Sequence, residues 1–89
     1  MDVSHLARSI VERVDQALDQ AEQSGRQPSV LVLGQEDFPA FQAWAREALD
    51  EAIETGSTYR GVRIRHNGAI FLSRLELQSK PGAPNALLL

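Results

Sequence analysis

The residues best suited to bind a partner are four arginines that lie within one short, acid-free segment. The segment from Thr55 to Leu75 holds four basic and no acidic side chains, whereas the rest of the chain holds five basic and twelve acidic ones. Arginine binds carboxylates and phosphates through paired hydrogen bonds and is favoured at protein interfaces. We therefore expect a surface that binds a protein or an anion, formed by Arg60, Arg63, Arg65 and Arg74 with Tyr59, Ile70 and Leu72.

Acidic residues gather near the ends of two predicted helices, and four of them form a second candidate surface. These four are Glu47, Asp50, Glu51 and Glu54. Carboxylates at a helix C-terminus are unfavourable beside the negative end of the helix dipole, so they attract cations. The arginines thus have two alternative partners: the acidic helix ends of their own molecule, or the acidic face of a neighbouring copy.

Residues that could support catalysis or bind a metal are few. The chain has two histidines and no cysteine, and neither His5 nor His66 stands at the spacing of a metal-ligand motif. The hydroxyls of Ser57, Thr58 and Ser73 lack an accompanying base or a glycine-flanked turn. We expect no catalytic residue, no metal site and no cofactor, and an enzymatic role would need a site shared between subunits.

Two further motifs are better explained by the fold than by binding. Gly34 follows an apolar run and precedes a helix, as in some phosphate loops, but Glu36 and Asp37 would repel a phosphate there. Asp37 is instead expected to cap the helix. The aromatic residues Phe38, Phe41 and Trp44 follow helical spacing and are expected in the core.

Two helices and one strand are expected before the arginines. Apolar residues recur every three or four positions from an N-cap at Ser4 to Ser24, which predicts an amphipathic helix. Ser29–Leu33 is a short apolar run that predicts a buried strand. A second helical pattern begins after Asp37 and keeps its register to Gly56.

The arginines themselves lie in a predicted β-hairpin. Tyr59–His66 and Ala69–Leu77 are β-rich runs separated by Asn67-Gly68, a pair typical of a type I′ turn. This turn would place His66 opposite Ala69, with Ile64 opposite Phe71, Val62 opposite Ser73 and Arg60 opposite Leu75 further along. One face would then be mostly apolar, and the other would carry Arg63, Arg65, Arg74, Ile70 and Leu72.

These elements predict an α+β fold in the order α-β-α-β-β, with a three-stranded mixed sheet. The first two strands should be parallel, joined by a right-handed crossover, and Ala69–Leu77 should be central. Both helices are expected on the face with Val62, Ile64 and Phe71; alternatively, they divide between the two faces and cover Ile70 and Leu72. Residues 1–79 form one domain, and residues 80–89 form a flexible tail.

Composition limits the function without identifying it. The net charge is −3 and the hydrophobic content is 43%, which is ordinary for a globular domain. There is no apolar run of about 18 residues and no signal-peptide pattern, so we expect a cytoplasmic protein with no membrane contact.

We favour a non-catalytic assembly or interaction protein, either a homo-oligomer or a module that docks on another protein. Small structural subunits of bacterial or viral assemblies are built in this way. The alternative is a weak binder of nucleic acid or a phosphate ligand through the same hairpin, with Tyr59 stacking on a base.

Overall fold

The computed structural model describes the backbone of residues 3–89 and the side chains of residues 10–89. Within residues 3–89 the chain forms two helices and five strands, which confirms the α+β class. They are α1 (Val3–Gln23), β1 (Pro28–Leu33), α2 (Asp37–Ala48), β2 (Thr58–Tyr59), β3 (Val62–His66), β4 (Arg74–Leu77) and β5 (Ala86–Leu88). The predicted cap at Ser4 and the side chain of His5 lie outside the described side chains.

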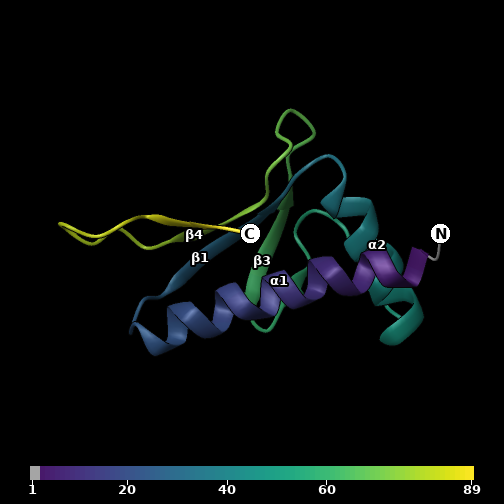
Figure 1. The fold of residues 1–89 in the computed structure, drawn as a ribbon, viewed down its shortest axis with the longest axis horizontal. Helices are drawn as coiled ribbons and strands as arrows, with labels where there is room; N and C mark the ends of the chain where they lie inside the picture. Colours follow the sequence, from purple (N-terminus) through teal and green to yellow (C-terminus); the bar gives the residue numbers. More distant parts are fainter. Residues whose placement is uncertain (1–2) are drawn as a thin grey trace.

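The strands form one mixed sheet in the order β2-β3-β1-β4-β5, so the predicted three-stranded sheet is wrong. The central strand is β1, not the segment Ala69–Leu77. It pairs parallel with β3, as expected for the first two strands, and antiparallel with β4. Both helices lie on one side of the sheet, where they share a single hydrophobic core with it (Figure 1).

The predicted Asn67-Gly68 hairpin does not form, because β1 lies between β3 and β4. None of its cross-strand pairs, from His66/Ala69 to Arg60/Leu75, is present. Residues 67–73 instead form a loop at the end of β1, seen at the top of Figure 1, where the Gln35 N–H donates to the Ile70 carbonyl. The physical reason is that β1 is apolar on both faces, and such a strand is most stable between two neighbours.

A two-residue hairpin turn does occur, but at Arg60-Gly61. Both residues have positive φ, 53° for Arg60 and 80° for Gly61, and Tyr59 pairs with Val62 across them. Positive φ at both central positions defines a type I′ turn. This turn joins β2 to β3, so the arginine in it points to a different part of the molecule from those that follow.

The second helix is shorter than its apolar pattern predicts, ending at Ala48 rather than near Gly56. Asp50 has a φ of 53°, and the Glu51 N–H donates back to the Ala45 carbonyl, which reverses the chain. Ile53 still reaches the core from this irregular segment, where its carbonyl accepts a hydrogen bond from Gln42 Nε2. The apolar spacing thus marks burial correctly but not helical structure.

Asp37 is not the N-cap of α2; Glu36 occupies that position without a side-chain hydrogen bond. The Asp37 carboxylate instead accepts hydrogen bonds from Arg13 (3.0 Å) and from the buried Ser73 hydroxyl (2.5 Å). That hydroxyl also accepts the Gly34 N–H at 2.9 Å. The network ties α1, α2 and the start of β4 to the end of β1, so Ser73 has a structural role.

The core is built from one face of the sheet and one face of each helix. Phe38 and Phe41 are buried in it, as predicted, and Trp44 packs against its edge. Phe71 was expected on the same face, but it lies in the 67–73 loop with 59% of its surface exposed. Because the predicted hairpin does not form, a large aromatic side chain that was predicted in the core lies at the surface.

The last residues, expected to be a flexible tail, include the edge strand β5. It pairs antiparallel with β4, and Leu87 and Leu89 pack against the core. The chain between these two strands extends beyond the end of α1 (Figure 1). Across the described residues, neither helix is both long enough and apolar enough to cross a bilayer.

Candidate functional site on the outer face of the sheet

Three of the four predicted arginines lie on the face of the sheet that is turned away from the helices. Leu31 and Leu33 of β1 face the core, so the alternating residues Val30 and Val32 lie on the opposite face of the sheet, where Val30 is half-buried and Val32 is fully covered. In the sheet register, Arg65 and Arg74 flank Val32, while Arg63 and Glu76 flank Val30. We call this group the arginine face: Arg63, Arg65, Arg74 and Glu76 around Val30 and Val32.

Glu76 pairs with two of these arginines. The Arg74 Nε donates to Glu76 Oε2 at 2.9 Å, and the Arg65 Nη2 lies 4.0 Å from the same oxygen. Arg65 is the looser partner, since 53% of its side chain is exposed against 32% for Arg74. Arg63 is exposed and forms no ion pair with the described side chains. The face therefore retains uncompensated positive charge.

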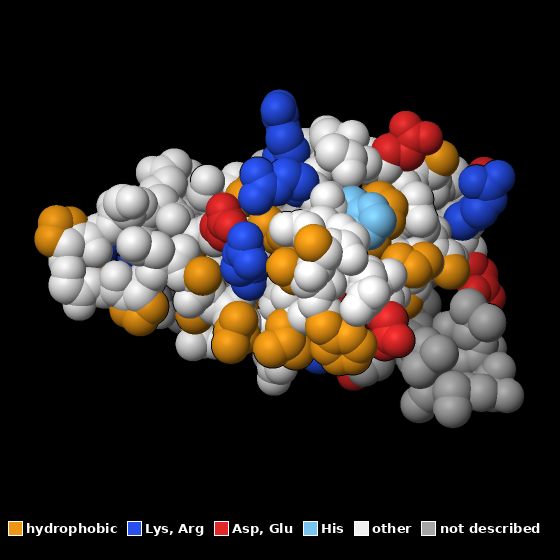
Figure 2. Space-filling view, turned by 90° about the horizontal axis from the view of Figure 1, so that it is seen from above, with side chains coloured by type: hydrophobic (Ala, Val, Ile, Leu, Met, Phe, Trp, Pro, Cys, Tyr) orange, Lys and Arg blue, Asp and Glu red, His pale blue; other side chains and the backbone are white. Residues whose placement is uncertain are grey.

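Exposed apolar side chains adjoin the arginine face. Phe71 and Leu72 lie in the loop between Arg65 and Arg74 and are 59% and 58% exposed. Leu88, the register partner of Arg74, is 73% exposed. Figure 2 looks onto this side and shows Lys or Arg side chains beside hydrophobic ones. Ile70 contributes less than predicted because it is half-buried, and Phe71 takes the place beside Leu72.

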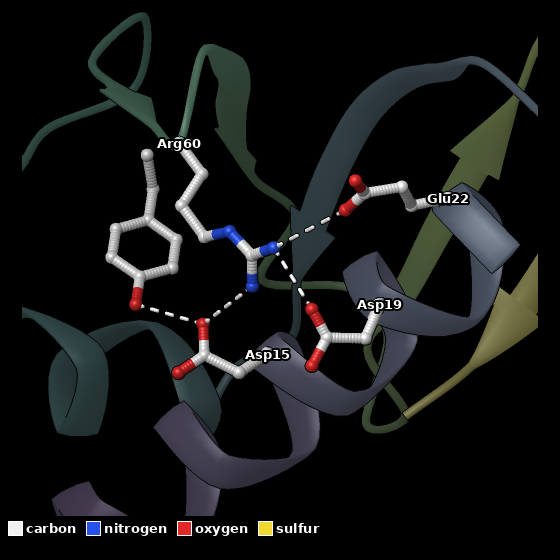
Figure 3. Close-up of polar contacts among 5 residues, drawn as sticks. Asp15, Asp19, Glu22 and Arg60 are labelled. Carbon is white, nitrogen blue, oxygen red and sulfur yellow. Dashed lines mark hydrogen bonds and ion pairs between the residues drawn. The ribbon is translucent and has the colours of Figure 1, made fainter.

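Arg60, by contrast, is used within its own molecule. From the Arg60-Gly61 turn its guanidinium donates to Asp15 Oδ1 at 3.2 Å and to Asp19 Oδ1 at 2.9 Å, with Glu22 Oε2 at 4.0 Å (Figure 3). These carboxylates stand in the C-terminal half of α1, where the helix dipole favours a cation. The intramolecular alternative thus holds for Arg60, which does not belong to the arginine face.

Tyr59 is likewise part of the fold, which removes the base-stacking role considered for it. Its hydroxyl donates to Asp15 Oδ1 at 2.9 Å, and its ring packs edge-on against Phe41 and Trp44. Burial raises the pKa of Tyr59 to about 12, and the hydrogen bond to Asp15 and its negative charge add to the effect.

The raised pKa of Tyr59 predicts a loss of stability in alkali. The folded state holds the phenol proton up to about pH 12, whereas the unfolded chain releases it near the ordinary tyrosine pKa of 10.0. The contribution is therefore complete below pH 10 and is lost as the pH rises to 12. Denaturant unfolding across this range should show a steeper decline for the wild type than for Tyr59→Phe. Equal slopes for the two proteins would contradict this prediction. Because the chain has one tyrosine, phenolate absorbance also measures the ionisation of Tyr59 directly.

The predicted acidic surface is exposed but is not one helix face, since α2 ends at Ala48. Glu47 is in the last turn, whereas Asp50, Glu51 and Glu54 lie in the irregular chain that follows. They flank Leu49 in the sequence, and Leu49 is 43% exposed. We call residues 47–54 the acidic segment. In Figure 1 the end of α2 lies well away from the 67–73 loop. The other end of the acidic segment comes closer to the arginine face, because the chain that follows Glu54 runs beside β3: Thr55 Oγ1 accepts the His66 N–H and the Gly56 N–H donates to the Ile64 carbonyl.

The other candidate groups have structural explanations. The His66 ring stacks on Phe38 with centroids 4.3 Å apart, and the Gly34 N–H is bonded to Ser73 rather than open to a phosphate. Within residues 10–89, no three His, Cys, Asp or Glu side chains come together in a way that could hold a metal ion. Comparison with models of protein families, with curated proteins and with solved structures found no match to this chain.

Proposed function

We propose that this protein is a non-catalytic assembly module in which the arginine face of one copy binds the acidic segment of the next. The observation that carries the proposal is the complementarity of the two surfaces. Each has exposed apolar side chains at a centre of contact, Phe71 and Leu72 beside the arginine face and Leu49 within the acidic segment. Each centre is bordered by charges of one predominant sign, and the two signs are opposite.

This arrangement matches the usual anatomy of a protein interface. Apolar anchors supply most of the affinity once water is excluded, and the charged rim aligns the partners and speeds their encounter. Arginine suits such a rim because its guanidinium is weakly hydrated and packs at an interface while it binds a carboxylate. Covering the exposed side chains of Phe71 and Leu72 would contribute most to the binding free energy, because it removes their apolar surface from water.

The contact would be heterologous, because the two surfaces on each molecule are different. Each bound copy still presents one unoccupied arginine face or acidic segment to a further copy. Contacts of this kind propagate into a ring, if the rotation closes, or into a filament. The proposal therefore predicts an assembly larger than a dimer.

Nucleic-acid binding through the same region is the less favoured function. It would use Arg63, Arg65 and Arg74 for the phosphates and Tyr59 to stack on a base, but the Tyr59 hydroxyl donates to Asp15 and its ring packs against Phe41 and Trp44. Glu76 also places a carboxylate among these three arginines, and this would repel phosphates.

The proposal predicts a mass that rises with concentration. Light scattering from about 1 μM to about 1 mM should show the wild type growing beyond a dimer, while Leu72→Asp stays monomeric. The substitution removes an apolar anchor beside the arginine face and puts a negative charge where the acidic segment of the neighbouring copy would bind, so like charges repel. Gln23→Asp adds the same charge at an exposed position on α1 and should assemble like the wild type. A wild type that remains monomeric throughout would refute the proposal.

A further inference from the structure

Glu76 occupies an unusual position for an acidic residue, at the centre of a cationic surface. It lies on β4 next to Arg74 in space and across β1 from the arginines of β3. One carboxylate oxygen is 2.9 Å from Arg74 Nε and 4.0 Å from Arg65 Nη2. About a third of the Glu76 side chain, 31%, is exposed. The group is thus held at the surface by two guanidiniums from different strands.

We propose that Glu76 is an internal competitor that makes the arginine face selective for protein carboxylates and prevents it from binding polyanions such as nucleic acid. The inference rests on the proposed function, since it assigns the selectivity of that same surface. It identifies Glu76 as a specificity-determining residue that acts through the arginines.

The spacing of the arginines explains why a competitor is needed. Arg63 and Arg65 are two residues apart on one strand, or about 7 Å, and Arg74 lies two strands away, or about 10 Å. Phosphates along a nucleic-acid backbone recur on a similar length scale, so the three guanidiniums would otherwise meet successive phosphates. Glu76 neutralises part of this surface and adds like-charge repulsion to every phosphate that approaches Arg65 or Arg74.

A protein carboxylate is affected much less by Glu76. Arg63 makes no ion pair with the described side chains, and Arg65 is held at 4.0 Å, beyond hydrogen-bond distance. One or two carboxylates can therefore bind these two residues while Glu76 stays on Arg74. The apolar anchors Phe71 and Leu72 then add affinity that a phosphate backbone has no side chains to use.

Removing the competitor should convert the surface into a polyanion-binding site. Fluorescence anisotropy with a labelled oligothymidylate of about 16 nucleotides would compare wild type, Glu76→Gln and Glu12→Gln. At about 50 mM salt we expect Glu76→Gln to bind roughly tenfold more tightly than both others, and to lose most of this gain near 200 mM. Glu12→Gln is the matched control, because Glu12 is exposed on α1 and its loss changes the net charge equally. Adding Arg63→Gln and Arg65→Gln to Glu76→Gln should abolish the gain.

Equal binding by Glu76→Gln and Glu12→Gln would overturn the inference, because net charge alone would then explain the change. Glu76→Thr should bind as Glu76→Gln does, because threonine is favoured in strands. This second variant shows whether the effect of Glu76→Gln comes from the lost charge or from misfolding of one variant. Wild-type binding as tight as that of Glu76→Gln would also overturn it. Light scattering separates this outcome from failure of the proposed function: a monomeric wild type refutes assembly, whereas the oligonucleotide result tests Glu76 alone.

Discussion

Replacing Phe41 by alanine is expected to lower the free energy of unfolding by about 3–5 kcal/mol. Phe41 has no exposed surface and packs between α2 and the sheet, with ring centroids 5.5 Å from Trp44 and 5.2 Å from Tyr59. The substitution removes buried apolar contacts and leaves a cavity that the sheet and two helices are too rigid to fill. Against a total stability of about 5–15 kcal/mol, this loss is a large fraction of the free energy of unfolding.

Phe71→Ala is the matched control, since it deletes the same side chain from the exposed 67–73 loop. Its expected cost is within about 0.5 kcal/mol. Urea unfolding followed by tryptophan fluorescence measures both, because the one tryptophan, Trp44, packs against Phe41. In a fold with the predicted hairpin, Phe71 would be in the core and the two variants would lose similar stability. Comparable losses would therefore contradict the structure.

Gly34→Ala should be the second most damaging change, at about 2–3 kcal/mol. A Cβ at this position would lie 2.6 Å from the Phe71 carbonyl oxygen and 2.9 Å from that of Ile70. Both are backbone atoms, and the Ile70 carbonyl is already bonded to the Gln35 N–H. The loop would have to move away from the end of β1. This would also weaken the hydrogen bond that the Gly34 N–H donates to the Ser73 hydroxyl.

Gly68→Ala tests the same loop without this clash. The nearest atoms to a Cβ there belong to the His66 side chain, at 3.7 Å and beyond, which is an ordinary contact. We expect a change within about 0.5 kcal/mol. If Asn67-Gly68 formed a type I′ turn, Gly68 would need a positive φ and its replacement would be the costly one. Thermal unfolding of the two variants would decide, and a reversed order would refute the loop geometry.

Local patterns predicted the elements better than their pairing. The apolar spacing of α1 and the short apolar run of β1 both correspond to observed elements, and the parallel pairing of the first two strands is confirmed. The central place of β1 could not be read from Asn67-Gly68, because a turn motif reports only local backbone preference. The insertion of β1 between β3 and β4 depends on contacts between distant residues.

Burial was easier to predict from the sequence than backbone conformation. Ile53 follows the helical spacing of α2 and is buried, yet the helix ends at Ala48 and an irregular segment delivers Ile53 to the core. The chain leaves the helix at Asp50 with a positive φ, and no glycine at this position indicates that conformation in the sequence. Helical spacing indicates which side chains face inward, and tertiary packing decides how the chain reaches them.

The candidate site was only partly visible in the sequence. Strand alternation correctly placed Arg63 and Arg65 on one face, and Arg74 shares that face, although through β1 rather than by direct pairing. Alternation also placed Arg60 on the opposite face from these three, but it could not identify the partners of Arg60, because Asp15 and Asp19 lie about forty residues earlier in the chain. Phe71 and Glu76 were missed, since both were assigned to a strand whose neighbours were wrong.

The most direct test of the assembly proposal is to mix two variants that each lack one surface. Leu72→Asp disables the arginine face, and Leu49→Asp disables the acidic segment, because each replaces an exposed apolar anchor by a charge. Light scattering should find each variant monomeric alone, and the equimolar mixture should form a one-to-one heterodimer that grows no further, because only one working pair of surfaces remains. Wild-type assembly by either variant alone, or a mixture that stays monomeric, would contradict the proposal.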